Sequence, residues 1–354
     1  MERTELEAIV RGEGDLPAVH DRDCGRGAYR GAQLAGGVFH KVRFSGADLR
    51  DADCRDAEFI HCDLREAQFD GAQLRQADFL GCSLDAAGFR GADLAYTSFM
   101  DCSLGNAVFA GVAMDNVDFI NCTLTGAQLG PKSAQNLNCV ECDLSRTSWR
   151  GGHFSRCTVI DSALQGIDFG DAHLEAPTFV RADLRNHDFT ALRLTMPQFH
   201  ECQLDGANFR SLQLDQIGLI GAGARNANFA GASLRNANFI GVDLTGSNLR
   251  GAIIEQALLI DADLTDCDVA EARAAQAQCA RMTAVRTDFS NTDLRYADLA
   301  HATLVRARLR HCSLYQANLH RIEDAESDWH GSDRLAARGD DPERARGEAF
   351  DPGG

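Results

Sequence analysis

Thiol and imidazole side chains recur at a fixed interval along this chain. Five cysteines are spaced by 20 residues: Cys62, Cys82, Cys102, Cys122 and Cys142. His153 and His173 have the same spacing. Side chains of these two types hold Zn²⁺ when three or four of them converge on one point, and neighbouring thiols can be oxidised to disulfides. The spacing therefore raises two chemical possibilities, a metal site and a ladder of disulfides.

Carboxylates are the second candidate for chemistry, because paired acids can act as general acid and base. Asp48, Asp63, Asp78 and Asp93 each stand directly before a Leu or a Phe. Such regular placement indicates a repeated structural motif. What these side chains can do depends on the elements that position them.

A five-residue repeat runs through most of the chain. Every fifth residue from Cys24 to Leu319 is apolar, and 46 of these 60 positions are Leu or Phe. The residue two places earlier is most often Ala or Cys, as in "GADLR" (46–50) and "NANFA" (226–230). A period of five fits neither a helix nor the alternation of a strand. It fits a chain that makes a quarter turn per repeat, with two side chains inward and three outward.

The pattern A-[DN]-[LF]-x-x resembles the pentapeptide-repeat family. The resemblance implies an all-β fold, a right-handed quadrilateral parallel β-helix with short helical caps. We expect about 15 coils of 20 residues, which at a strand spacing of ~4.8 Å would form a rod of roughly 70 Å. Leu and Phe alternate along the core positions, which predicts Phe on two opposite faces and Leu on the other two.

The ends of the repeat need caps, because an open β-helix end exposes unpaired backbone groups. Residues 1–20 are predicted to be an N-terminal cap, in which "TELE" (4–7) has the form of a capping box that opens a short helix. The β-helix itself is expected to cover residues 21–319. Residues 320–354 are predicted to be a C-terminal cap and charged tail. There we expect Trp329 over the last coil and a short helix near 342–349, with a disordered tail as the alternative.

This frame decides the chemistry. All 13 cysteines fall at the two inward positions of the repeat, where Cys acts as a small apolar residue. We therefore expect reduced structural thiols and no metal site inside the coils. His153 and His173 should stack on the surface without a third ligand, since Arg193 follows on the next coil. The acids lie on a convex surface without a nucleophile–base pair or phosphate-binding loop. The sequence predicts neither an enzyme nor a cofactor.

One outward position is not explained by the repeat. On one of the four faces, the residue directly after the core residue is large and apolar in ten of 11 coils, and only His200 interrupts the series. We name this series the apolar stripe: Ile60, Leu80, Met100, Ile120, Val140, Ile160, Val180, Ile220, Ile240 and Ile260. A contiguous exposed stripe usually marks an interface. The stripe would contact a protein partner or form a homodimer, with Arg55, Arg65 and Arg75 as a polar rim. The alternative is that these side chains only pack against neighbouring coils.

A rigid scaffold for protein–protein interaction is the function that this surface favours. The C-terminal part, from "TDFSNTDLRY" (287–296) to "DDPERARGEAF" (340–350), resembles pentapeptide-repeat proteins encoded in bacterial type VI secretion clusters. That resemblance implies an adaptor or loading partner for a secretion spike or effector. The alternative is a DNA mimic that binds DNA gyrase or topoisomerase and protects it from inhibitors, as some members of the family do. The net charge of −17 fits this alternative, but the acids form no continuous row like that of DNA phosphates.

Composition excludes further classes. An acidic chain is not expected to bind nucleic acid directly, because this requires a basic surface. The sequence contains no apolar run long enough for a transmembrane helix, and "MERTELEAIVRGEGDL" lacks the apolar core of a signal peptide. Many unpaired thiols suit a reducing compartment. We therefore expect a cytoplasmic protein without membrane contact.

Overall fold

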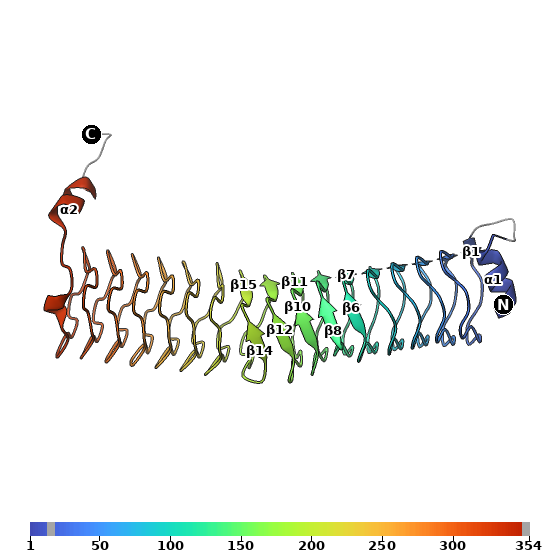
Figure 1. Ribbon diagram of the computed structural model, residues 1–354, viewed down its shortest axis with the longest axis horizontal. Helices are drawn as coiled ribbons and strands as arrows, with labels where there is room; N and C mark the ends of the chain where they lie inside the picture. The colour runs from blue at the N-terminus through green and yellow to red at the C-terminus, as the bar shows by residue number, and fades with distance from the viewer. Residues whose placement is uncertain (13–17, 349–354) are drawn as a thin grey trace. The chain divides into compact units, whose positions relative to one another are not determined.

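The computed structural model describes residues 1–12 and 18–348, and Figure 1 shows the course of the chain. The chain forms two compact units, residues 1–183 with 191–193, and residues 184–190 with 194 onward. Each unit is a stack of parallel β-coils. The predicted all-β, right-handed β-helix is confirmed. Neither helix within the described residues has the length and apolar character needed to span a bilayer.

The corners of the coils explain the five-residue period. At Phe44 the chain turns, and the Ala47 N–H donates to the Phe44 carbonyl at 2.9 Å. Gly46, between them, has a φ of 65°, a left-handed conformation that Gly, Asn and Asp adopt most readily. After the corner, the Leu49 N–H donates to the Gln68 carbonyl of the next coil at 2.9 Å. Each repeat therefore contributes one corner and one link to the neighbouring coil.

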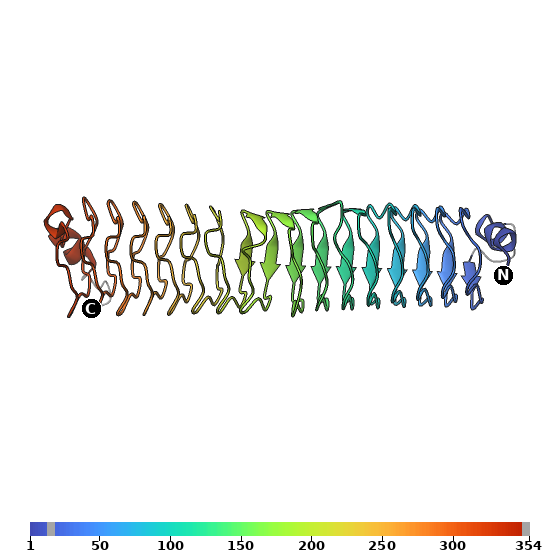
Figure 2. The same ribbon diagram turned by 90° about the horizontal axis from the view of Figure 1, so that it is seen from below.

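Short parallel strands mark two faces of the first unit (Figures 1 and 2). The strands of one face are β1 (Ala18–His20), β2 (Val38–His40), β3 (Glu58–Ile60), β4 (Asp78–Leu80), β5 (Ser98–Met100), β7 (Asp118–Ile120), β9 (Asn138–Val140), β11 (Thr158–Ile160) and β13 (Thr178–Val180). The second face has β6 (Ala113–Asp115), β8 (Ser133–Gln135), β10 (His153–Ser155) and β12 (His173–Glu175). The remaining strands are β14 (Arg193–Thr195) and β15 (Gln198–His200). Partners are 20 residues apart, as in Phe59↔Phe79.

The second unit keeps the 20-residue register with isolated bridges in place of regular strands. These bridges run from Gln198↔Gly218 to Asn318↔Arg338. A closed corner explains the difference: the Ala222 N–H donates to the Leu219 carbonyl at 2.9 Å, and this shortens the extended run. Among the described residues of the first unit, nine turns carry a regular strand on the face that begins with β1. This number of strand-bearing turns is smaller than the 15 coils expected from the repeat.

Two ladders of phenylalanine fill the core of the first unit. One contains Phe59, Phe79, Phe99 and Phe119, and the opposite one contains Phe69, Phe89 and Phe109. Neighbouring rings within the first ladder are stacked, with centroids 4.8–5.0 Å apart. The two ladders meet edge to face, as between Phe89 and Phe99 at 6.0 Å. Phe therefore lines two opposite faces, as the alternation of core residues predicts.

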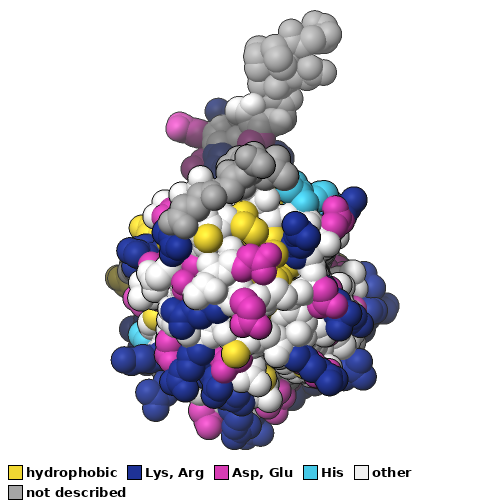
Figure 3. All heavy atoms as spheres, turned by 90° about the vertical axis from the view of Figure 1, so that its right-hand side faces the viewer, with side chains coloured by type: hydrophobic (Ala, Val, Ile, Leu, Met, Phe, Trp, Pro, Cys, Tyr) yellow, Lys and Arg dark blue, Asp and Glu magenta, His cyan; other side chains and the backbone are white. Residues whose placement is uncertain are grey.

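Helix α1 (Arg3–Val10) covers the first coil. Its Leu6 is fully buried, and the Arg3 guanidinium donates to the carbonyls of Arg30 and Gly31 at 2.7 Å each. The predicted capping box is wrong, because the helix already begins at Arg3 and Thr4 lies inside it. Docking onto the first coil, rather than a side-chain cap, positions the helix start. Figure 3 looks onto this end of the unit, where charged side chains of both signs surround small apolar patches.

The chain leaves the last coil through a short 3₁₀ helix, η1 (Arg334–Ala336). Trp329 is half-buried there. Its indole lies 4.5 Å from the Arg334 guanidinium, and its Nε1–H donates to Asp324 Oδ2 at 3.1 Å. Trp329 is therefore held at the end of the second unit by a cation–π contact and a hydrogen bond.

Helix α2 (Pro342–Glu348) follows. Asp341 caps it, because its Oδ1 accepts the N–H groups of Glu343 and Arg344 at 2.9 and 3.1 Å. The described part of the predicted 342–349 helix is thus helical. Residues 13–17 of the predicted N-terminal cap, residue 349 of the predicted helix and the end of the tail to 354 lie outside the described residues.

Candidate protein-interaction surface

Seven members of the apolar stripe, Ile60 to Val180, lie at the last positions of in-register strands in the first unit. Side chains alternate along a strand, so Phe119 points into the core and Ile120 points outward. None of the seven is buried; Ile120 is 38% exposed and the other six are half-buried. At a coil spacing of ~4.8 Å, in-register neighbours such as Met100 and Ile120 each cover part of the next side chain. The first unit therefore presents a continuous, half-exposed apolar row.

The second unit carries the other three members of the stripe. Ile220 and Ile240 are 47% and 39% exposed, and Ile260 is half-buried. Ile220 follows Leu219, whose corner is closed by a backbone hydrogen bond. All ten predicted interface residues thus point away from the core, and their role as an interface stays a prediction.

Arginines on the two faces that flank the apolar stripe in the first unit are tied to aspartates. Arg65 makes two parallel hydrogen bonds to Asp63, both of 2.8 Å, and Arg55 binds Asp53 in the same way at 2.8 and 2.6 Å. The hydrogen bond from Arg65 holds the pKa of Asp63 below its usual value. The carboxylates therefore stay ionised and are locally neutralised. At Arg55 and Arg65 the predicted polar rim therefore consists of ion pairs rather than of unpaired charges.

The cysteine ladder has a structural explanation that the spacing alone does not give. All 13 cysteines are buried, and none of them forms a disulfide. On the face of the stripe the corner is open, and the Cys62 N–H donates to Cys82 Sγ at 3.4 Å rather than closing a turn. The Cys102 thiol in turn lies 3.3 Å from the Phe79 carbonyl of the previous coil. The thiols thus form hydrogen bonds with the backbone groups that have no turn partner at an open corner.

Replacing one rung by serine should therefore be nearly neutral. Ser162 already occupies the next rung of this ladder, and its hydroxyl donates to the Ile160 carbonyl at 2.8 Å. We expect Cys102→Ser to change the free energy of unfolding by less than about 1 kcal/mol, because one hydrogen-bond donor replaces another. Cys54→Ser is the matched comparison. The Cys54 thiol lies at a core position, and burial raises its pKa.

Urea denaturation of both variants tests this explanation. Cys54→Ser should cost about 1–3 kcal/mol, because a buried hydroxyl there has no partner within the described residues. Equal losses in the two variants would contradict a hydrogen-bonding role for the ladder.

His153 and His173 stack as the spacing predicts, with ring centroids 4.8 Å apart and planes 3° from parallel. Within residues 1–12 and 18–348, this pair belongs to no group of three metal-ligating side chains. Such a group does occur elsewhere, at His301, His320 and Glu348. Sequence reasoning missed it because the histidines are 19 residues apart rather than 20, and because the glutamate comes from the tail.

Comparison with protein families decides the relationship of this chain. The model described as Pentapeptide repeats (8 copies) matches residues 30–66, 67–106, 97–130, 219–251 and 285–321, and the model described as Pentapeptide repeat region matches residues 139–209. Together these matches cover more than half of the chain. The chain belongs to the pentapeptide-repeat family.

Solved structures of other pentapeptide-repeat proteins are similar to it. QnrB1, described as a plasmid-mediated fluoroquinolone resistance protein, is 19% identical with a TM-score of 0.37, over 56% of this chain and 87% of QnrB1. HetL, from the cyanobacterium Nostoc sp. and involved in heterocyst differentiation regulation, is 21% identical with a TM-score of 0.29, over 65% of this chain and 90% of HetL. No curated protein matches the sequence.

Proposed function

We propose that this pentapeptide-repeat protein is a non-catalytic scaffold that binds a protein partner through the apolar stripe. One observation carries the proposal: ten large apolar side chains recur at one outward position, and none of them is buried. The β-helix needs apolar residues at its inward positions only. Ordinary proteins rarely expose contiguous apolar rows of this kind unless another surface covers them.

The acidic surface supports a scaffold over a DNA mimic. Asp48, Asp53 and Asp63 each hold an arginine two residues further on by paired hydrogen bonds. A phosphate mimic would instead need carboxylates that are free to contact a DNA-binding protein. The formal net charge of −17 is therefore spread over a surface on which many acids are already neutralised.

The partner class follows from the C-terminal resemblance. We propose a secretion spike or effector as the partner, with the protein acting as its adaptor in the cytoplasm, where 13 reduced thiols are stable. A modulator of DNA gyrase is the second candidate, supported by the net negative charge and the β-helical fold. The two candidates separate in one assay. A gyrase modulator protects supercoiling activity from a quinolone, whereas a secretion adaptor has no effect on it.

The stripe itself is tested by charge substitution. We expect the double variant Ile120→Asp, Ile160→Asp to stay folded, because both side chains are partly exposed, and to lose binding. Central interface residues contribute about 2 kcal/mol or more each, so affinity should fall at least 30-fold. Light scattering measures the molar mass of the wild type and variant. If the wild type is monomeric, binding to purified candidate partners is measured instead.

The control places the same charges in the same unit but off the stripe, with Ala110→Asp and Gln165→Asp. This control should keep its association and its circular dichroism spectrum. Unfolding of the stripe variant would show that these residues belong to the core. An equal loss of binding in the control would show that added negative charge, rather than the stripe, matters.

A further inference from the structure

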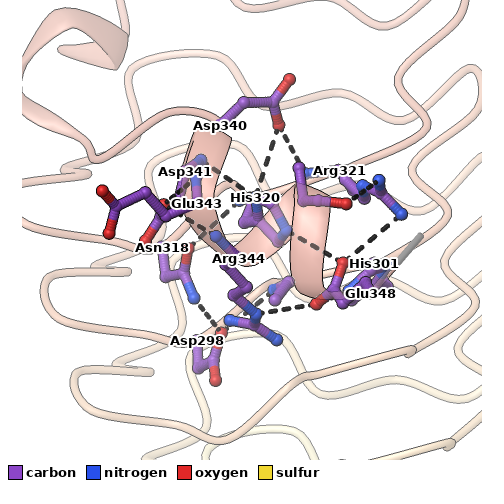
Figure 4. A network of polar contacts seen from close by, with 12 residues as sticks. Asp298, His301, Asn318, His320, Arg321, Asp340, Asp341, Glu343, Arg344 and Glu348 are labelled. Carbon is purple, nitrogen blue, oxygen red and sulfur yellow. Dashed lines mark hydrogen bonds and ion pairs between the residues drawn. The ribbon is translucent and has the colours of Figure 1, made fainter. Parts of the chain in front are cut away.

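Two histidines and a glutamate converge at the end of the second unit. His301 and His320 lie on successive coils, and both rings face Glu348 of α2 (Figure 4). His301 Nε2 is 3.1 Å from Glu348 Oε1, and His320 Nε2 is 3.2 Å from Glu348 Oε2. One ligand atom from each of the three residues lies within 4.8 Å of the others. Three separate parts of the chain thus bring their donor atoms to one point.

The buried histidine is held in place by its surroundings. His320 is only 1% exposed. Its backbone N–H donates to Asn318 Oδ1 at 3.1 Å, and the Asn318 amide donates to Asp298 at 2.8 Å. The other ring nitrogen, Nδ1, accepts the Asp341 N–H at 3.1 Å. These contacts hold the ring with its Nε2 atom directed toward Glu348.

We propose that His301, His320 and Glu348 form a binding site for a divalent transition-metal ion such as Zn²⁺. Imidazole nitrogens and a carboxylate oxygen suit this class of ion, and three protein ligands leave a fourth position for water. Bonds of about 2.0–2.1 Å to Zn²⁺ place tetrahedral donors about 3.3 Å apart. The two histidine–glutamate separations, 3.1 and 3.2 Å, are close to this value but involve different carboxylate oxygens. Because the three donor atoms lie within 4.8 Å of one another, small side-chain movements would bring them around one ion.

The Glu348 carboxylate is held by the two histidines and by two arginines. The Arg344 Nε–H donates to Glu348 Oε1 at 2.8 Å, and an Arg321 guanidinium nitrogen lies 3.4 Å from Oε2. A metal ion therefore competes with two arginines for this carboxylate, and removing one of them should strengthen metal binding.

Metal binding also requires one proton to move. In the metal-free site His320 Nδ1 accepts a hydrogen bond, so the proton of the neutral ring is on Nε2 and points at Glu348. Coordination through Nε2 requires the tautomer with the proton on Nδ1, so the hydrogen bond from the Asp341 N–H to Nδ1 would be lost. The Asp340 carboxylate, 3.8 Å from Nδ1, would accept a hydrogen bond from this Nδ1–H after a small approach, as carboxylates commonly do for metal-bound histidines. The ion would thereby fasten α2 to the last coils through bonds stronger than the present hydrogen bonds.

Titration of the full-length, untagged protein with Zn²⁺ tests the site. Metal is first removed with a chelator, binding is measured by calorimetry, and Co²⁺ absorption reports the coordination geometry. We expect one ion per chain with a tetrahedral Co²⁺ spectrum. His301→Gln and Glu348→Gln should each weaken binding at least tenfold, and Arg344→Gln should strengthen it. Because His301 and Glu348 are partly exposed, circular dichroism of these variants should match the wild type.

The chain offers a matched control. His311 and His330 form a similar edge-to-face pair, with ring centroids 5.8 Å apart against 5.4 Å for His301 and His320, but no metal-ligating group of three includes them within the described residues. The double variant His311→Gln, His330→Gln should bind Zn²⁺ as the wild type does. Absence of binding in the wild type, equal binding in Glu348→Gln, or loss in the control would each overturn the proposal.

Discussion

Phe99→Ala should lower the free energy of unfolding by about 3–5 kcal/mol, the range for removing a buried phenylalanine. Phe99 stacks on Phe79 at 4.8 Å and on Phe119 at 5.0 Å, and it meets Phe89 and Phe109 edge to face. Alanine would leave a gap between two coils. Because each coil is stabilised mainly by its neighbours, the gap weakens both interfaces at once. Urea denaturation followed by circular dichroism measures the loss.

Met100→Ala is the control for this prediction, since Met100 is the next residue and points outward. It is half-buried, and its truncation should cost no more than about 1 kcal/mol. Similar losses for the two variants would contradict the assignment of inward and outward positions. A large loss for Met100→Ala alone would mean that the apolar stripe, rather than the ring ladder, stabilises the coils.

Leu6→Asp should detach α1 and expose the first coil of the β-helix. Leu6 is fully buried, so the variant loses the apolar contact and would also bury an unpaired carboxylate, a combined cost above about 4 kcal/mol. We therefore expect α1 to detach from the first coil. The exposed coil then presents the unpaired N–H and C=O groups of an uncovered β-edge, which promote association between chains. Light scattering should therefore detect large assemblies that the wild type does not form.

Glu5→Ala on the exposed side of the same helix is the matched control. It should remain as soluble as the wild type. A soluble Leu6→Asp variant of unchanged molar mass would show that α1 is dispensable as a cover for the first coil. Loss of solubility in both variants would point to a general effect of charge changes in the helix.

The architecture could be predicted from sequence because the repeat leaves little choice. A core residue such as Leu64 or Phe69 at every fifth position permits one arrangement of inward and outward faces, so the outward direction of Ile120 could also be predicted. The open corner at Cys62 could not be predicted. A corner is closed by one backbone hydrogen bond, and the repeat provides the donor and the acceptor at open and closed corners alike. The helix start at Arg3 could not be predicted either, because it depends on the contacts of Arg3 with Arg30 and Gly31.

The metal site lies beyond the reach of sequence reasoning for a different reason. His301 and His320 are at successive coils but one residue out of phase, and periodicity alone does not predict that their rings meet. Glu348 reaches them only because the chain reverses after the last coil, with Asp341 bound to His320. The path of a non-repeating tail is set by such individual contacts, which have no signature in a repeat pattern.

Because of the 20-residue register, the position of a residue within the repeat determines the face of the unit on which it lies. Removal of a whole 20-residue coil from the first unit would leave the remaining residues of the apolar stripe on the same face as Ile60. The stripe would only become shorter. Removal of five residues would rotate the rest of this unit by a quarter turn. The apolar row would then be cut and its second part moved to a neighbouring face, although every core position remained filled. For this protein, an insertion or deletion can therefore preserve folding completely and still erase a binding surface.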